Sequence, residues 1–272
     1  MTWGPVGPAW LFCPADRPER FQKAADLADM VILDLEDGVN PVDRPAARLA
    51  LESNLLDPVR TIVRVNPADS QDCVLDLAAI GRTPYSIIML AKTESYDQVS
   101  AMGDRRVIAL CETARGVLDS SHIAAATSTV GLMWGAEDLV ASLGGRSSRD
   151  EHGNYRAFAT FARARVLLAA ALYSRVAIDA VHLDIGDVEG LQREAQDAAA
   201  SGFSATACIH PSQLQVVRDA YRPTTDEVAW ATGVIDAAKS SRGVFTFEGR
   251  MVDAPLLRHA EAIIRQFGAS PR

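Results

Sequence analysis

Features of disulfide-rich, membrane-spanning and secreted proteins are scarce in this sequence. Its 272 residues include only four cysteines, far apart and without a C-x-x-C pair, so free thiols are expected rather than a disulfide framework or a zinc site. No apolar run approaches the roughly 18 residues of a transmembrane helix. The N-terminal stretch MTWGPVGPAW lacks the basic and long apolar regions of a signal peptide. We therefore expect a cytoplasmic protein without a membrane partner.

Positively charged residues are fewer than negatively charged ones. Lys and Arg number 27 against 35 Asp and Glu, which gives a net charge of −8 at pH 7. A nucleic-acid partner favours a basic surface, so we expect none. Hydrophobic residues make up 48% of the chain and charged residues 23%, which is typical of a soluble globular protein. The length is sufficient to bury a full core, and these values suit a cytosolic enzyme.

Short apolar runs alternate with amphipathic segments along the chain. The runs predict eight strands, at residues 10–13, 30–35, 61–65, 86–90, 107–111, 130–134, 180–183 and 207–209. Helical segments lie between them, among them residues 19–28, 45–56, 158–173 and 189–200. Eight strands with intervening helices, over roughly 210 residues, predict an α/β fold of the (β/α)8 or TIM-barrel type. A doubly wound open sheet is the alternative, but no G-x-G-x-x-G follows the first strand.

A different pattern begins after residue 220. The segment from Pro223 to Glu227 has threonine at a cap position followed by acids, which predicts a helix start. That helix is expected to end near Gly243, a β-like piece follows at 244–247, and a last helix starts at Pro255. We expect a barrel domain over 1–220 and a C-terminal helical extension over 221–272, packed elsewhere or exchanged with a neighbouring subunit.

Carboxylates crowd at the end of the second predicted strand, where the apolar run 31–33 leads into Asp34, Glu36 and Asp37. Two carboxylates ~5 Å apart repel by roughly 3 kcal/mol at an effective dielectric of ~20. Such a cluster requires a cation, a hydrogen-bond donor or a bound proton. Because active sites of this fold lie at the carboxyl ends of the strands, the cluster predicts a site at this end of the barrel.

The other predicted strand ends carry both carboxylates and cations. Such a mixture suits an anionic substrate together with a hard metal such as Mg²⁺, which takes one or two carboxylates plus substrate and water. Glu112 and Asp138 follow adjacent strands and could share one ion. The remaining charged groups at these ends include Arg17, Arg64, Lys92, Glu94, Glu137, Asp184, Asp187 and His210, with Lys23 nearby.

Five motifs, taken in order, resemble a known family. They are DLEDGV (34–39), RVN (64–66), ETARGV (112–117), GAEDL (135–139) and IHPSQ (209–213). From Leu11 to about Phe267 the chain is similar to the citrate lyase beta-subunit-like proteins of the HpcH/HpaI aldolase superfamily, close to the malyl-CoA and citramalyl-CoA lyases. The resemblance implies a Mg²⁺-dependent TIM-barrel enzyme that makes or breaks a C–C bond between a thioester and an oxo acid.

The resemblance also implies roles for individual residues. Glu112 and Asp138 would hold Mg²⁺, Arg64 would bind a carboxylate or thioester oxygen, and the coenzyme A phosphates would lie against Arg17 and Lys23. Apart from the resemblance, the place of Glu36 in the carboxylate cluster favours a contact with substrate or metal-bound water. We also expect the backbone N–H groups of Gly135, Ala136 and Glu137, at the predicted start of a helix, to bind the substrate carboxylate.

The segment GVFTFEGRMVD (243–253) resembles the C-terminal lid of the CoA-dependent members. In those enzymes the lid covers a neighbouring subunit's site, and its aspartate, matched here by Asp253, is the general acid/base. We therefore expect a homo-oligomer, a trimer or a multiple of it. The implied reaction cleaves or condenses a carboxylated 3-hydroxyacyl-CoA, such as malyl-, citramalyl- or hydroxymethylglutaryl-CoA, with acetyl-CoA and an oxo acid as the other partners.

Several alternatives stay open. The chain could be the beta subunit of a citrate lyase complex that acts on an acyl-carrier thioester, a thioester hydrolase or, more remotely, a phosphoenolpyruvate-utilising phosphotransferase. Departures from the family pattern, Ala205-Thr206 and Ala15, leave the substrate open. Plain structural roles are alternatives for the charged groups: helix caps for Glu112, Asp138, Asp184, Asp187 and Asp253, ion pairs for Arg64, Asp34 and Asp37 (the last two with Lys92 or Arg115), and a satisfied structural histidine for His210.

Overall fold

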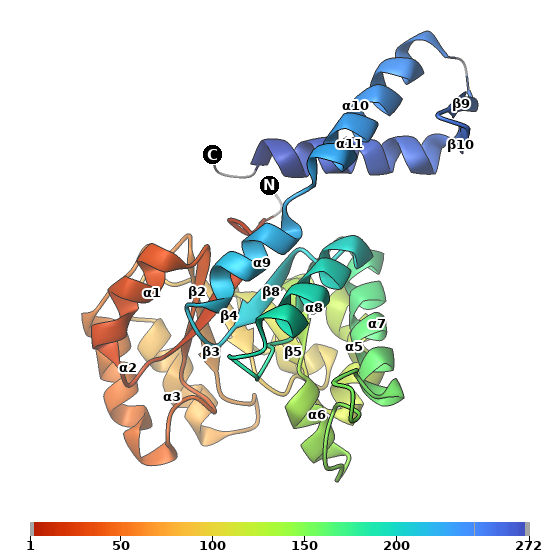
Figure 1. Cartoon of the computed structure of the whole chain (residues 1–272). Coiled ribbons are helices and arrows are strands. Elements are labelled where there is room, and N and C mark those ends of the chain that lie inside the picture. Colours follow the sequence, from red (N-terminus) through yellow and green to blue (C-terminus); the bar gives the residue numbers. More distant parts are fainter. Residues whose placement is uncertain (1–2, 242, 270–272) are drawn as a thin grey trace. The chain divides into compact units, whose positions relative to one another are not determined.

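Eight parallel strands close into a barrel in the computed structural model, which describes residues 3–241 and 243–269. The strand order follows the sequence, and β1 closes the ring by pairing with β8. Figure 1 shows the barrel strands with helices such as α1, α2, α5 and α7 on the outside. The predicted TIM-barrel fold is therefore confirmed. The strands are β1 (Ala9–Pro14), β2 (Met30–Asp34), β3 (Thr61–Val65), β4 (Ile87–Leu90), β5 (Arg106–Cys111), β6 (Thr129–Trp134), β7 (Val176–Asp179) and β8 (Ala205–Cys208).

The barrel interior is filled by alternate strand residues. Successive side chains of a strand point to opposite faces, so every second residue enters the interior. Trp10, Ile32, Ile108 and Met133 belong to this buried cluster. The other face of each strand is covered by helices, so both faces are apolar and the strands appear in the sequence as continuous apolar runs.

Helices follow the strands around the barrel. They are α1 (Phe21–Leu27), α2 (Arg44–Ser53), α3 (Gln71–Ile80), α4 (Tyr96–Ser100), α5 (Ala114–Ala125), α6 (Ala136–Ser142), α7 (Ala157–Leu172), α8 (Val188–Ser201) and α9 (Gln213–Tyr221), with short 3-10 turns at Pro18–Arg20 and Pro41–Asp43. The predicted helices at 19–28, 45–56, 158–173 and 189–200 correspond to α1, α2, α7 and α8 within a few residues. No helix in the described ranges is both long and apolar enough to cross a bilayer.

One predicted strand was wrong. The run 180–183 is not a strand; β7 lies just before it, at Val176–Asp179, and pairs with β6 and β8. The chain 176–183 is apolar apart from Asp179 and His182, so it offers two adjacent strand candidates, 176–179 and 180–183. Asp179 is buried inside the true strand because it accepts hydrogen bonds from Arg163 and from Trp134 Nε1, the latter at 2.6 Å.

The chain divides into two compact units, Met1–Val217 and Arg218–Arg272. The second contains α10 (Thr225–Ser240), an antiparallel pair β9 (Phe245–Phe247) and β10 (Arg250–Val252), and α11 (Ala254–Ala269). Thr224 and Glu227 form a capping box at the start of α10, which is the cap predicted from the sequence. Buried side chains including Val234, Val252 and Ile263 give this unit a core of its own.

Candidate active site

The carboxylate cluster predicted at the end of β2 lies at the carboxyl ends of the barrel strands. Asp34 is 2% exposed and is held by four donors: Arg64 Nε at 2.7 Å, Arg64 Nη2 at 2.6 Å, and the backbone N–H groups of Glu36 and Gly38 at 2.9 Å each. The expected partners of Asp34, Lys92 or Arg115, were therefore wrong, because β2 pairs with β3 in a register that places Arg64 opposite Asp34. The two-pronged Arg64–Asp34 pair fixes the guanidinium.

Arg64 also reaches Glu36, with Nη1 3.2 Å from Glu36 Oε2. Its guanidinium lies 4.8 Å from the ring centre of Phe12 on β1. Burial alone would lower the pKa of Arg64, but the attraction of Asp34 and Glu36 outweighs burial and raises that pKa above its usual range. Arg64 is thus a permanently charged and immobilised cation at the end of β3.

Lys92 is the centre of the cluster; it was predicted at a strand end as a partner of Asp34 or Asp37, and the structure adds contacts with Glu36, Asp138 and Glu112. It follows β4 and has a left-handed backbone with φ of 49°, which is uncommon for a residue other than glycine. Its ammonium lies 2.5 Å from Glu36 Oε1, 2.9 Å from Asp37 Oδ2 and 3.2 Å from Asp138 Oδ1. Its backbone N–H donates to Glu112 Oε1 at 3.0 Å. The pairing of Asp37 with Lys92 was predicted and is confirmed.

These contacts shift several pKa values. Burial alone would raise the pKa of Asp37, but the hydrogen bond from Lys92 lowers it. Burial raises the pKa of Glu36, against the opposing attraction of Arg64 and Lys92. Burial disfavours the Lys92 ammonium, yet its hydrogen bonds to Glu36 and Asp37 raise the Lys92 pKa above the usual range. A lysine held in the charged form is unsuited to Schiff-base chemistry.

Glu112 is the most deeply buried acid on the β5 side of the cluster. It directly follows β5, is 2% exposed, and has its pKa raised to about 8, first by burial and then by the nearby charge of Asp138. It does not cap α5, because Thr113 takes that position and accepts from Gly116 N. A cation placed beside Glu112 and Asp138 would favour the ionised carboxylate and relieve this repulsion.

Asp138 lies in the first turn of α6, with its side chain 34% exposed. Gly135 precedes α6 at its N-cap, where an added Cβ would lie 2.8 Å from Glu112 Oε2 and 3.0 Å from Glu112 Cβ. Ala136 is buried, whereas Glu137 is turned away to accept a hydrogen bond from Ser148 Oγ at 2.7 Å. Because Gly135 has no side chain, the backbone at the end of β6 can lie close to Glu112.

The donor set fits a hard divalent ion. Among the described residues, no group of three or more His, Cys, Asp or Glu side chains is arranged to enclose a metal. Two carboxylates, Glu112 and Asp138, leave the other positions of an octahedral ion to substrate and water, which is the usual arrangement for Mg²⁺.

Other predicted residues have identifiable structural roles. His210 Nδ1 lies 2.8 Å from Ser212 Oγ, and Asp187 caps α8 by accepting from Gly190 N at 2.8 Å. Arg17 and Lys23 are exposed near the end of β1 and on α1. Asp253, in the second unit, accepts from Leu256 N at 3.1 Å at the start of α11. The contacts do not test the coenzyme A contact predicted for Arg17 and Lys23, or the proton transfer predicted for Asp253. These roles stay predictions.

Several known proteins are similar to this chain in sequence. The profile of the HpcH/HpaI aldolase/citrate lyase family matches residues 9–211. The chain is 59% identical over 268 residues to the citrate lyase subunit beta-like protein of Mycobacterium tuberculosis (strain CDC 1551 / Oshkosh), with 98% of each chain covered. It is 31% identical over 287 residues to the mitochondrial citramalyl-CoA lyase of Homo sapiens, covering 93% of this chain and 83% of that protein.

A solved structure is similar over almost the whole chain. It is the crystal structure of protein CitE from Mycobacterium tuberculosis in complex with magnesium, acetoacetate and coenzyme A. The TM-score is 0.94 at 58% identity, and 97% of this chain and 98% of that chain are covered. The chain belongs to the HpcH/HpaI aldolase/citrate lyase family.

Proposed function

We propose that this chain is a Mg²⁺-dependent carbon–carbon lyase that cleaves or condenses a carboxylated 3-hydroxyacyl-CoA, with acetyl-CoA and an oxo acid as the other partners. The observation that carries the proposal is the buried Glu112 beside Asp138, next to the fixed cation Arg64. A site with two acids and a rigid guanidinium suits a metal and an anionic substrate together. Malyl-, citramalyl- and hydroxymethylglutaryl-CoA are the candidate substrates.

The relatives support the same chemistry. The similar CitE structure holds magnesium, acetoacetate and coenzyme A, which are a hard metal, an oxo acid and the thioester carrier. A relative covered over most of its length is a citramalyl-CoA lyase. We extend these ligands to the site at Glu112 and Asp138.

The residues have distinct parts in the proposed reaction. Glu112 and Asp138 would hold Mg²⁺, which supplies Lewis-acid polarisation of a substrate oxygen when bound. Arg64, oriented by Asp34, would stabilise negative charge developing on the thioester oxygen. Asp253 would transfer a proton to or from the acetyl carbon.

Other contacts complete the proposed site. The backbone N–H groups of Gly135, Ala136 and Glu137 would bind the substrate carboxylate, and Glu36 would contact substrate or a metal-bound water. Arg17 and Lys23 would meet the coenzyme A phosphates. A homo-oligomer, a trimer or a multiple of it, and a cytoplasmic location belong to the same proposal.

Glu112→Gln and Asp138→Asn provide the direct test. Each should lower Mg²⁺-dependent release of acetyl-CoA by about 100-fold or more, because each removes one of only two carboxylate ligands. Substrate profiling with malyl-, citramalyl- and hydroxymethylglutaryl-CoA, followed by acetyl-CoA release, measures the effect. Glu19→Gln, an exposed acid on the 3-10 turn before α1, is the matched control and should retain activity. Full wild-type turnover in EDTA would refute the metal role.

A citrate lyase beta subunit that acts on an acyl-carrier thioester is the second candidate, because the Mycobacterium tuberculosis relative is named as beta-like. Turnover on an acyl-carrier thioester, without turnover on any CoA thioester, would favour it. Release of free hydroxy acid and CoA in place of acetyl-CoA would instead identify a thioester hydrolase.

A further inference from the structure

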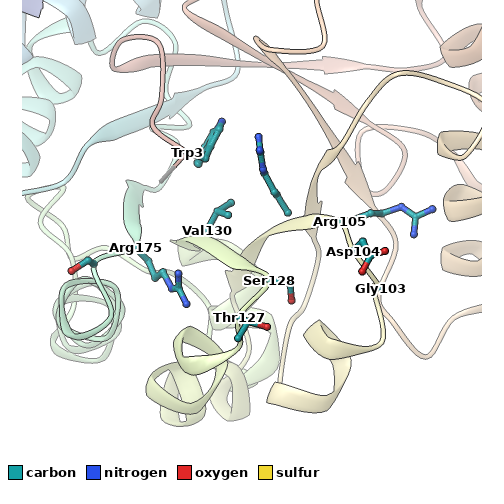
Figure 2. Close-up of a pocket in the computed structure, with 10 residues that line it drawn as sticks. Trp3, Gly103, Asp104, Arg105, Thr127, Ser128, Val130 and Arg175 are labelled. Atoms are coloured by element: carbon teal, nitrogen blue, oxygen red, sulfur yellow. The ribbon is translucent and has the colours of Figure 1, made fainter. Parts of the chain in front are cut away.

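A cavity of about 420 Å³ opens at the end of the barrel opposite to the carboxylate cluster. Its lining comes from the residues that begin β5, β6 and β7, together with Trp3 near the N-terminus. In Figure 2, Trp3 lies over Val130, and Arg175, Thr127 and Ser128 surround the same opening. Since the eight barrel strands are parallel, their first residues gather at one mouth of the barrel and their last residues at the other.

Three arginines line this cavity, and none of them forms an ion pair with a residue in the described ranges. Arg175 donates from Nε to Ala124 O and from Nη2 to Ala126 O, each at 3.1 Å. Arg105 donates to Met102 O and Leu77 O, and in Figure 2 its side chain points away from Val130. Backbone carbonyls position these guanidinium groups without neutralising their charge.

Arg106 is the most informative of the three. It is the first residue of β5 and is exposed. Ile108 and Leu110 of the same strand belong to the interior cluster, so the two-residue period places Arg106 on the inward face, at the mouth. The Arg106 side chain makes no hydrogen bond with the described part of the chain. Among the described residues that line the cavity, Asp104 is the one carboxylate against three arginines, so the local charge is positive although the whole protein carries −8.

The remaining lining residues narrow the class of ligand. Thr127, Ser128 and Ser174 present hydroxyl groups, which donate to tetrahedral oxyanions. Trp3 and Val130 form an apolar wall that packs against the barrel core. We propose that this mouth is a second ligand site, which binds a small phosphate monoester with its phosphate at Arg106 and Arg175 and its apolar body against Trp3.

Phenyl phosphate is a suitable probe, titrated by calorimetry into the full-length protein in EDTA. We expect saturable binding at or below about 1 mM, weakened by roughly tenfold or more in Arg106→Gln, since a guanidinium–phosphate contact is charge-assisted. Inorganic phosphate should bind more weakly than phenyl phosphate, and Trp3→Ala should reduce that difference. Benzoate tests whether a carboxylate serves equally well; equal affinity would overturn the phosphate assignment.

Arg193→Gln is the matched control, because it removes the same charge from an exposed position on α8 that belongs to neither site. It should leave phenyl phosphate affinity unchanged. If Arg193→Gln abolished binding while Arg106→Gln did not, or if the wild-type protein did not bind at all, the proposal would fail. Arg175→Lys keeps the charge but loses the planar set of guanidinium N–H donors, so it should also weaken the binding of phenyl phosphate. Thermal denaturation checks that this variant is folded. Arg106→Gln should retain lyase turnover, so the outcome is independent of the proposed reaction.

Discussion

Glu112 is the residue whose charge state depends most on a bound cation. Burial and Asp138 raise its pKa to about 8, so without a cation the carboxyl is mostly protonated at pH 7. A metal binds the ionised form and must displace the proton. Because the folded, metal-free pKa is raised, the competition from the proton is strongest below pH 8 and disappears above it.

We therefore expect Mg²⁺ affinity to rise as the pH increases toward about 8 and then to level off. Calorimetry in two buffers with different ionisation enthalpies should show release of nearly one proton for each Mg²⁺ bound at pH 6.5, and far less at pH 9.5. Glu112→Gln should abolish the proton release. A Mg²⁺ affinity that is constant between these two pH values would contradict the assignment.

Asp34 offers a test of stability in the same cluster. Asp34→Asn removes the two-pronged carboxylate partner of Arg64 and leaves only the contact with Glu36, so we expect the free energy of unfolding to fall by about 3–5 kcal/mol. Asp37→Asn is the matched control, because the Asp37 side chain is 55% exposed, and should cost under about 1 kcal/mol. Denaturant unfolding measures the free energy of unfolding of both variants. Equal losses would show that the buried Arg64–Asp34 pair stabilises the fold no more than the exposed Asp37 does.

At the scale of elements, the ends of β5 and β6 set the shape of the proposed metal site. Gly135 lies between them, at the start of α6, and a methyl group there would approach both Oε2 and Cβ of Glu112. The Cβ contact matters more, because Cβ is fixed to the backbone and cannot rotate away. The sequence alone gives no signal for this requirement.

Gly135→Ala should therefore lower Mg²⁺ affinity and turnover by about tenfold or more, as expected when the orientation of a metal ligand is disturbed. Gly81→Ala is the control: it adds a methyl at the end of α3, where the nearest atom, Leu77 O, is an ordinary 3.4 Å away. Mg²⁺ titration and lyase assays compare the two variants. Equal activity in both would show that Glu112 moves without functional loss.

The sequence predicted the elements of the barrel better than the contacts between them. Seven of the eight strands were placed within a residue or two, because each is a short apolar run, but β7 was missed where Asp179 interrupts the run. Glu112 and Asp138 were predictable because each comes shortly after one of two adjacent strands, Asp138 in the first turn of α6. Lys92 was predicted at a strand end and as a partner of Asp37, but its contacts with Glu36, Glu112 and Asp138 were not, since they depend on the closed barrel.

At the scale of the whole molecule, the chain consists of two units, each with its own core. The barrel unit holds Glu112, Asp138 and Arg64, and the second unit holds Asp253. An enzyme that draws its proton-transfer group from a neighbouring subunit would depend on assembly, and this dependence can be measured with mixed subunits.

Asp253→Ala and Glu112→Gln should each be inactive alone, and their mixture should regain partial activity if the second unit serves a neighbouring subunit. Acetyl-CoA release after verified subunit exchange is the measurement. Two separately prepared samples of Glu112→Gln, mixed in the same way, are the control and should stay inactive. Absence of recovery in the first mixture would count against action between subunits.

Lys92 gives the site a property that its carboxylates alone would not have. Its ammonium is already bound to Glu36, Asp37 and Asp138. If Glu112 and Asp138 hold the metal as proposed, an incoming divalent ion would have to displace this ammonium from Asp138. Metal binding would then be an ion exchange, in which the affinity of the ion for the two carboxylates must exceed that of Lys92 for Asp138.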